Sequence, residues 1–291
     1  MRMEQPDYIF EKFNPDLCIE NRIKLQNVSS LALTKSQVLN VAGSSHVNKP
    51  YFVTQLREKF WAGVDRKQLY LSPGTIWGFP GKGLKDGNIC DQIVANVRRV
   101  SEQDGYNGQI LVLVLGTNDA SEVYSPTDLK MFKGKCRDFY IRLLEIPGLF
   151  LMPCGLLPRL FQKNRPRANP NMYYSNCAVK EVCQELRSGL LYRERIKFTD
   201  INHDIAEVVP AHVVPNPDVV PVPTTVPFKG MLLPDNVHLT HEGNQKMIEN
   251  MLRAINLIPG SIFGIPPPPR KSSFAPFCVL CDIFWPGSKI K

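Results

Sequence analysis

The stretch that decides the fold of this chain is ILVLVLGTND, residues 110–119. Its first six residues are all apolar, and a run without alternation is typical of a parallel strand covered on both faces. The sequence GTND follows at once and predicts a turn where that strand ends. Because ligands of open parallel sheets bind beyond the carboxyl ends of the strands, residues 116–119 are the first candidates for a functional site.

Outward from this stretch, short apolar segments alternate with helical patterns in both directions along the chain. The pattern predicts strands at residues 38–42, 68–71, 110–115, 149–153 and 196–199, and helices at residues 50–60, 88–100, 130–144, 173–187 and 242–256. Five short strands, each followed by a helix or a long connection, favour parallel pairing with right-handed crossovers. The expected fold class is therefore α/β: a three-layer α/β/α sandwich around a five-stranded, mainly parallel sheet of the flavodoxin-like kind.

The length of the chain and its proline content indicate how it is divided. At 291 residues it is long enough for one substantial core. We interpret residues 1–36 as an N-terminal lead-in, 37–258 as the domain, and 259–291 as a proline-rich linker and C-terminal tail. Residues 208–227, VVPAHVVPNPDVVPVPTTVP, alternate valine with proline. Proline lacks the backbone donor that a sheet interior needs, so this segment predicts an extended, polyproline-like excursion over the surface.

The formal net charge of +8 bears on possible partners. Such a charge could favour anionic partners such as nucleic acid or acidic lipid head groups. However, the sequence contains no block of five or six like charges, and its densest basic run is the short one formed by Arg159, Lys163, Arg165 and Arg167. The sequence therefore predicts no more than a weak contact with nucleic acid or an anionic surface.

Cysteines and apolar runs argue against several other classes of protein. Eight cysteines in a chain of this length do not predict a disulfide scaffold. Cys278 and Cys281 form one C-x-x-C pair, a weak metal signal without a second pair or a histidine at zinc-finger spacing. No stretch of about 18 apolar residues is present, and the N-terminus lacks the apolar core of a signal peptide. We therefore expect an intracellular, cytoplasmic protein.

Four clusters of polar residues and glycines lie where functional groups are expected. Residues 43–46 (GSSH) follow the first predicted strand, a glycine-rich segment at 74–83 follows the second, and residues 116–119 follow the third. Residues 235–240 (DNVHLT) directly precede the last predicted helix. Because the carboxyl ends of parallel strands share one edge of a sheet, we expect the four clusters to converge there.

In this order the four clusters resemble the sequence blocks of the SGNH (GDSL-like) hydrolase superfamily, over roughly residues 37–255. The resemblance implies a serine esterase with Ser45 as nucleophile, His238 as general base and Asp235 as the partner of the histidine. It also implies an oxyanion hole formed by Ser45, Gly81 and Asn118. The sequence departs from the family pattern at residue 44, where a serine stands in place of the usual aspartate, so the hydrogen bonding of this loop is left open.

The residue types also fit acyl transfer on physical grounds. A serine hydroxyl is a weak nucleophile unless a nearby base removes its proton, and histidine titrates near neutral pH. An acid three residues before the histidine can reach its other ring nitrogen and fix the tautomer. Asn118 and the backbone N–H groups of Gly81 and Ser45 would face the oxyanion of the tetrahedral intermediate. Gly78 and Gly83 compete with Gly81 for this place.

Other polar residues of the clusters have alternative interpretations. Ser44 is a second candidate nucleophile, although the G-x-S register favours Ser45, which could itself be a simple cap of the following helix. Asn118 could merely cap a turn. His241, three residues after His238, would suggest a metal pair in isolation, but the first turn of the last helix is its expected place.

Together these observations predict a serine esterase that hydrolyses a carboxylic ester, such as a lipid or acetyl ester, through an acyl-enzyme intermediate. No metal or organic cofactor is expected. The alternative is a binding module that keeps the fold and acts on nucleic acid or protein through its basic surface. More loosely, residues 149–159 (LFLMPCGLLPR), with the helix and the IKFTDI segment that follow, resemble the esterase modules of animal non-LTR retrotransposons and related host genes.

Overall fold

The computed structural model describes residues 37–63, 71–104, 106, 108–123, 125–159, 168–209 and 223–258. The predicted lead-in at 1–36 and the tail at 259–291, with Cys278 and Cys281, lie outside these residues. So do residues 210–222 of the valine- and proline-rich segment, and the basic residues 163, 165 and 167.

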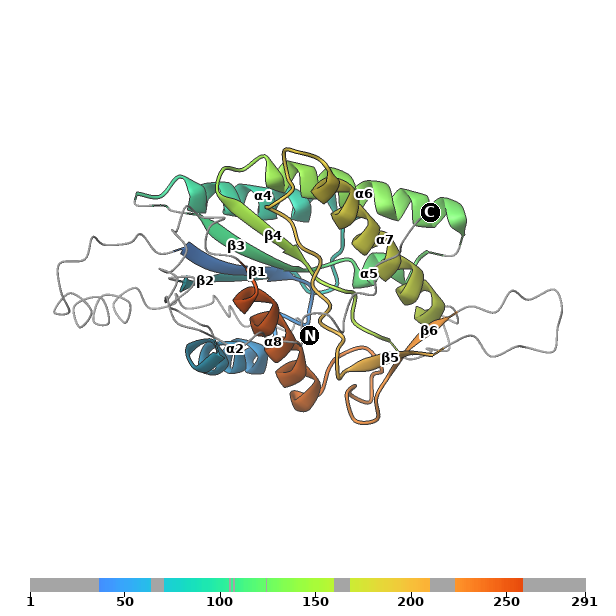
Figure 1. Ribbon diagram of the computed structural model, residues 1–291. Helices are drawn as coiled ribbons and strands as arrows, with labels where there is room; N and C mark the ends of the chain where they lie inside the picture. The colour runs from blue at the N-terminus through green and yellow to red at the C-terminus, as the bar shows by residue number, and fades with distance from the viewer. Residues whose placement is uncertain are drawn as a thin grey trace, which may run out of the picture.

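A parallel sheet of four strands forms the centre of the fold (Figure 1). In spatial order the strands are β2 (Leu71–Gly78), β1 (Gln37–Gly43), β3 (Gln109–Val114) and β4 (Leu149–Pro153). The fifth predicted strand, at 196–199, is present only as two isolated parallel bridges, Leu151 to Ile196 and Cys154 to Thr199. The α/β fold with a parallel sheet is thus confirmed, with four full strands and a bridged segment beside β4 among the described residues.

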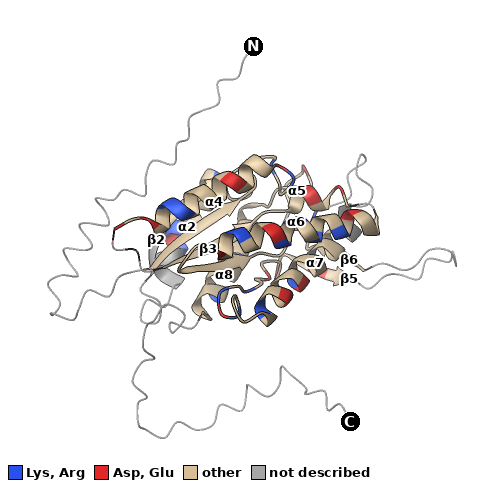
Figure 2. Ribbon diagram, turned by 90° about the horizontal axis from the view of Figure 1, so that it is seen from above, with Lys and Arg blue, Asp and Glu red and all other residues tan. Residues whose placement is uncertain are grey.

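Helices cover both faces of this sheet, which gives the three layers expected from the sequence (Figure 1). One face carries α4 (Gly87–Ser101), α6 (Pro126–Leu144) and α7 (Ala168–Ser188), and the other carries α2 (Pro50–Gly63) and α8 (His241–Asn256). In Figure 2 the ribbons of helices α4, α6 and α7 are coloured for both basic and acidic residues, not for one sign of charge alone. No helix in the described ranges is long and apolar enough to cross a membrane.

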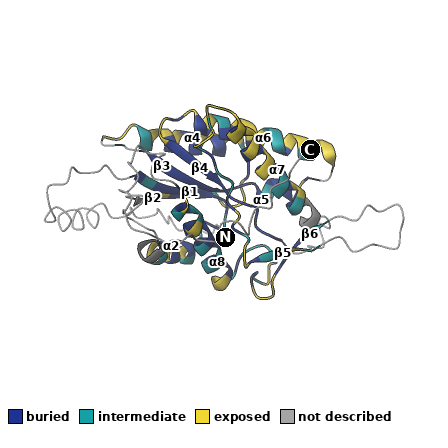
Figure 3. Ribbon diagram, in the orientation of Figure 1, coloured by how far each residue is buried: buried dark blue, intermediate teal, exposed yellow. Residues whose placement is uncertain are grey.

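The unbroken apolar run of β3 is explained by two separate cores, one on each face of the sheet. Leu111 and Leu113 pack in the core beneath α4, α6 and α7. Ile110, Val112 and Val114 pack in the core beneath α2 and α8. All five side chains are buried, as the dark blue colour of β3 in Figure 3 shows, and burial of each contributes about 1.5–3 kcal/mol. Both faces of β3 therefore need apolar residues.

The second strand differs from its prediction. It extends over Leu71–Gly78, so Gly74 lies inside a strand and not in a turn. A Cβ atom on Gly74 would stand 2.3 Å from Oδ1 of Asn40, which accepts a hydrogen bond from the backbone N–H of Thr75. The register between β1 and β2 shifts at this point. A glycine is therefore needed here because the Asn40 side chain approaches the backbone closely at a β-bulge. In the sequence, such a glycine cannot be told from one in a turn.

The valine- and proline-rich segment also differs from its prediction at its two ends. Residues Ala206–Val209 form β5 and Thr224–Pro227 form β6, and the two strands pair antiparallel. None of the three residues 224–226 is proline, so each keeps its backbone N–H donor. The two strands can therefore pair here, whereas a segment with a proline at every second position could not.

Candidate active site

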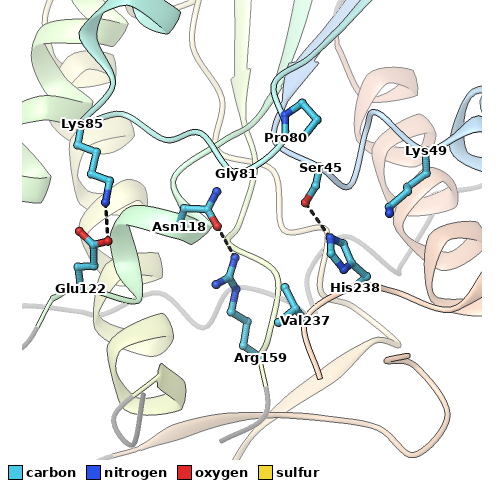
Figure 4. A pocket seen from close by; sticks show the side chains of 10 residues that line it. All are labelled: Ser45, Lys49, Pro80, Gly81, Lys85, Asn118, Glu122, Arg159, Val237 and His238. Carbon is cyan, nitrogen blue, oxygen red and sulfur yellow. Dashed lines mark hydrogen bonds and ion pairs between the residues drawn. The ribbon is translucent and has the colours of Figure 1, made fainter. Parts of the chain in front are cut away.

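The four polar clusters meet in one pocket of about 630 Å³. It is lined by Ser45, Lys49, Pro80, Gly81, Lys85, Asn118, Glu122, Arg159, Val237 and His238 (Figure 4). The lining comes from the turn after β1, the loop after β2, the short helix α5 (Thr117–Ala120) after β3, the segment after β4, and the loop before α8. The pocket therefore lies at the edge where the parallel strands end, as the sequence predicted for the clusters.

Ser45, His238 and Asp235 form a continuous chain of hydrogen bonds. Nε2 of His238 lies 2.9 Å from Oγ of Ser45 (Figure 4). Nδ1 of the same ring lies 2.6 Å from Oδ2 of Asp235. An ionised carboxylate only accepts hydrogen bonds, so the proton of the neutral ring sits on Nδ1. Nε2 is then the acceptor, and the hydroxyl of Ser45 donates to it. This is the arrangement in which a ring can take a proton from serine.

The turn that carries Asp235 keeps this carboxyl group ionised. Oδ1 of Asp235 accepts hydrogen bonds from the backbone N–H groups of Val237 and His238, both at 2.9 Å. Partial burial by itself raises the pKa of Asp235, but these bonds and the one from the imidazole outweigh it and lower the pKa to about 2. The carboxylate is therefore charged at any pH near neutrality.

The segment after this turn is anchored to α8 and α2. Thr240 caps α8 by accepting a hydrogen bond from the backbone N–H of Gly243 at 3.2 Å. The hydroxyl of Tyr51 donates to the carbonyl of Leu239 at 3.2 Å. His241 opens α8, where its ring contacts Nε2 of Gln55, so it lies in the first helical turn as expected. No cluster of possible metal ligands occurs within the described part of the chain.

The two adjacent serines point to different surroundings. Ser44 is buried, and its Oγ lies 3.4 Å from Nδ1 of His46, whereas Ser45 lines the pocket. Nε2 of His46 donates to the carbonyl of Val237 at 3.1 Å, which ties the turn after β1 to the residue before His238. Ser44 thus contacts the buried ring of His46, which holds the turn after β1 against the loop before α8.

His46 is a residue to which sequence reasoning assigned no role. It is completely buried, and its ring centroid lies 5.4 Å from that of His238. Burial is the main cause that lowers its pKa to about 3 despite the hydrogen bond to Val237, and electrostatic repulsion from His238, Arg159 and Lys49 lowers it further. His46 is therefore uncharged near neutral pH, and its ring links Ser44 to the carbonyl of Val237. Its position directly after Ser45 was the only sequence signal for this.

Of the three competing glycines, Gly81 is the one that lines the pocket. Its φ of +71° is in the left-handed region, and no atom lies within 4 Å of the place of a Cβ. At Gly83 a Cβ would stand 2.1 Å from Oδ2 of Asp119. That carboxylate accepts hydrogen bonds from the backbone N–H groups of Leu84 and Lys85, at 2.8 and 2.7 Å. Asp119 thus braces the loop of Gly81 against α5.

Asn118 lies beside Gly81 in the pocket, with its amide held in one orientation. Its Nδ2 donates to the carbonyl of Lys82 at 2.8 Å, and its Oδ1 accepts from Nη2 of Arg159 at 2.5 Å. An amide nitrogen has two protons, so Nδ2 keeps a second donor after the bond to Lys82. The contact with Arg159 was missed, because the sequence marked this residue only as part of a short basic run and as the last residue of the LFLMPCGLLPR segment.

Comparisons with known proteins found structural likeness without sequence matches. A scan against protein-family models and a search of curated proteins gave no match. Similar solved structures include a lipase/acylhydrolase from Enterococcus faecalis (14% identity, TM-score 0.46, 76% of this chain and 95% of that chain). They also include a GDSL-like lipase from Bacteroides thetaiotaomicron (14%, 0.46, 81% and 96%) and an acetyl xylan esterase (15%, 0.46, 75% and 99%). At these identities and TM-scores the likeness does not extend to function.

Proposed function

We propose that this chain is a serine esterase of the SGNH type, which hydrolyses a carboxylic ester through an acyl-enzyme intermediate on Ser45. The observation that supports the proposal most is the chain of hydrogen bonds from Ser45 through His238 to Asp235, which opens on a pocket. The order of the sequence clusters is an independent argument. Residues 37–258 would form the catalytic domain.

In the first half of the reaction, Oγ of Ser45 attacks the carbonyl carbon of the ester, and its proton passes to Nε2 of His238. Asp235, which stays ionised, stabilises the imidazolium that forms. The bond to the alcohol oxygen then breaks, and the alcohol leaves with the proton of His238. A water molecule then attacks the acyl carbon and gives a proton to Nε2 of His238. The bond between the acyl carbon and Oγ of Ser45 breaks, Oγ takes the proton from His238, and the carboxylic acid leaves.

The oxyanion of each tetrahedral intermediate would lie between Ser45, Gly81 and Asn118. The backbone N–H groups of Ser45 and Gly81 and the second Nδ2 proton of Asn118 are its donors. Arg159 and Lys82 fix the amide of Asn118, so this donor is oriented before substrate binds, which is the condition for electrostatic stabilisation at small reorganisation cost. Each such donor contributes about 2.7–4 kcal/mol to transition-state stabilisation in known cases.

The substrate would be a small-molecule ester or a lipid or acetyl ester, and the pocket of about 630 Å³ is within the range of about 300–1,000 Å³ found for small-molecule sites. The looser resemblance to the esterase modules of non-LTR retrotransposons stays a prediction.

The experiment that tests the proposal is covalent labelling by a fluorophosphonate together with hydrolysis of 4-nitrophenyl esters from acetate to long-chain acyl. Labelling requires an activated serine, so the modified peptide should contain Ser45. The Ser45→Ala variant should lose both labelling and hydrolysis, whereas Ser44→Ala should keep measurable turnover. A folded wild-type protein that is neither labelled nor active would contradict the proposal and favour a binding module.

A further inference from the structure

Positive charge gathers around the candidate pocket. Its lining includes three cationic side chains, those of Lys49, Lys85 and Arg159, and among the described lining residues Glu122 is the one carboxylate (Figure 4). Lys85 and Glu122 form an ion pair with each other on one side of the pocket. Their charges largely cancel, and Lys49 and Arg159 are the other two cations of the lining.

The two remaining cations lie on different sides of the candidate nucleophile. In Figure 4, Lys49 lies beside Ser45 and His238, and Arg159 lies on the side of Asn118. Within the described ranges no carboxylate comes within ion-pair distance of Lys49. An ester bound at Ser45 would therefore have a cation near either end.

The side chain of Arg159 is buried in the wall of the pocket and held in place there. It is 6% exposed, and its Nη2 is fixed on the amide of Asn118 at 2.5 Å. A guanidinium keeps its charge in every protein environment, so Arg159 presents a positive charge in the wall of the pocket. The field of both cations reaches the site, since Arg159 and Lys49 each contribute to lowering the pKa of the nearby His46.

We propose that the pocket selects esters that carry an anionic group of their own, a carboxylate or a phosphate, which Arg159 and Lys49 bind. This inference rests on the proposed esterase function and specifies its substrate class. Guanidinium groups bind carboxylates and phosphates through paired, charge-assisted hydrogen bonds, and lysine adds a point charge. The positive pocket would also attract anionic esters from solution, an effect that salt weakens.

A rival explanation makes a different prediction. The same cations could act only on the oxyanion that develops during the reaction, and they would then accelerate neutral and anionic esters by the same factor. Selection of an anionic substrate instead changes the ratio of the two rates. The ratio of kcat/KM values for matched esters is therefore the quantity to measure.

The test uses one substrate pair with the charge on the alcohol side and one with it on the acid side. The pairs are 4-acetoxybenzoate with 4-acetoxybenzamide, and mono-4-nitrophenyl adipate with 4-nitrophenyl methyl adipate. In at least one pair, the wild-type chain should prefer the anionic ester by about tenfold in kcat/KM, the effect of one charge-assisted hydrogen bond. The preference should decrease as sodium chloride is raised.

Variants assign the preference to the two cations. Arg159→Gln and Lys49→Gln should each reduce the anionic-to-neutral ratio by several fold, and Arg159→Lys should retain part of it. Lys59→Gln is the matched control, because Lys59 lies on α2 outside the pocket lining and pairs with Glu249. It should keep the wild-type ratio. Lys49 is only partly buried, so its variant tests the proposal even if the Arg159 variants fail to fold.

Two results would overturn the inference. Wild-type ratios near one in both pairs would show that the pocket does not select charge. An Arg159→Gln variant and a Lys49→Gln variant that slow both members of a pair equally would assign the cations to the oxyanion alone. Failure of the proposed function is a different result, since it appears as absence of hydrolysis of all four esters together with absence of fluorophosphonate labelling.

Discussion

The buried histidine behind the pocket makes the stability of this chain depend on pH in a predictable way. His46 has a pKa of about 3 in the folded chain, against 6.5 for the exposed side chain of an unfolded chain. As the pH falls below 6.5, the unfolded chain binds a proton that the folded chain does not. The contribution of His46 to the free energy of unfolding is therefore fully present above the unfolded pKa and is lost progressively as the pH falls toward about 3.

The magnitude follows from these two pKa values. Between about pH 7.5 and about pH 5, protonation of the unfolded imidazole alone lowers the free energy of unfolding by about 2 kcal/mol. Asp235 does not contribute in this window, because its pKa of about 2 in the folded chain and 3.8 in the reference state both lie below it. A loss of about 2 kcal/mol is a large part of the stability of an ordinary domain.

The variant His46→Gln isolates this effect, since glutamine keeps an N–H donor for the carbonyl of Val237 and does not titrate. Urea unfolding of the wild type and the variant, followed by far-UV circular dichroism at both pH values, gives the four free energies that are needed. The variant should lose about 2 kcal/mol less than the wild type between the two pH values. His203→Gln is the matched control, because the side chain of His203 is 61% exposed, and it should retain the wild-type loss.

Equal losses in the wild type and in His46→Gln would refute the reasoning. They would mean that His46 is either protonated in the folded chain or exposed to water, and the hydrogen bond to Val237 would then have to be assigned differently. Absolute stability is not the measure here, because the substitution can destabilise the core at both pH values.

Three further predictions concern the residues around the nucleophile. Asn118→Ala should lower kcat by about 10²–10³ with a smaller effect on KM, because its donor acts mainly in the transition state, and an unchanged kcat would remove it from the oxyanion hole. Asp235→Asn should lower kcat by up to about 10⁴, since the ring then loses its charged partner and its tautomer, and wild-type rates would exclude this aspartate. Gly83→Ala should lower both Tm and kcat, because its Cβ would stand 2.1 Å from Oδ2 of Asp119, whereas Gly87→Ala, with no atom within 4 Å, is the control and should change neither. Thermal unfolding measures Tm and ester hydrolysis measures kcat. Equal values for the two glycine variants would contradict the conclusion that Asp119 holds the loop of Gly81 in place.

The sequence by itself determined the layers of the fold and the edge at which the clusters meet. The apolar run of β3 predicted a strand covered on both faces, because a strand between two cores has no face left for polar residues. Helical periodicity located α4, α6, α7 and α8, since one apolar side every third or fourth residue is a local property of the chain. The four clusters could be assigned to one edge because strand ends in a parallel sheet are equivalent.

Only the tertiary structure decided which residues of the clusters face the pocket. Ser44 and Ser45 are adjacent and chemically alike, and what separates them is the contact of Ser44 with His46 in the interior. Gly74 belongs to a strand because of Asn40, which lies 34 positions earlier and approaches it closely. Neither contact leaves a periodic signal in the sequence.

The contacts of Arg159 and His46 show most clearly what the sequence alone could not predict. Arg159 acts on Asn118, 41 positions away, and His46 acts on Val237, 191 positions away. Local patterns report burial and secondary structure because these depend on near neighbours and on the faces of one element. Hydrogen bonds between loops depend on how the strands are ordered in the sheet and on where each loop then ends, and that information exists only once the chain has folded.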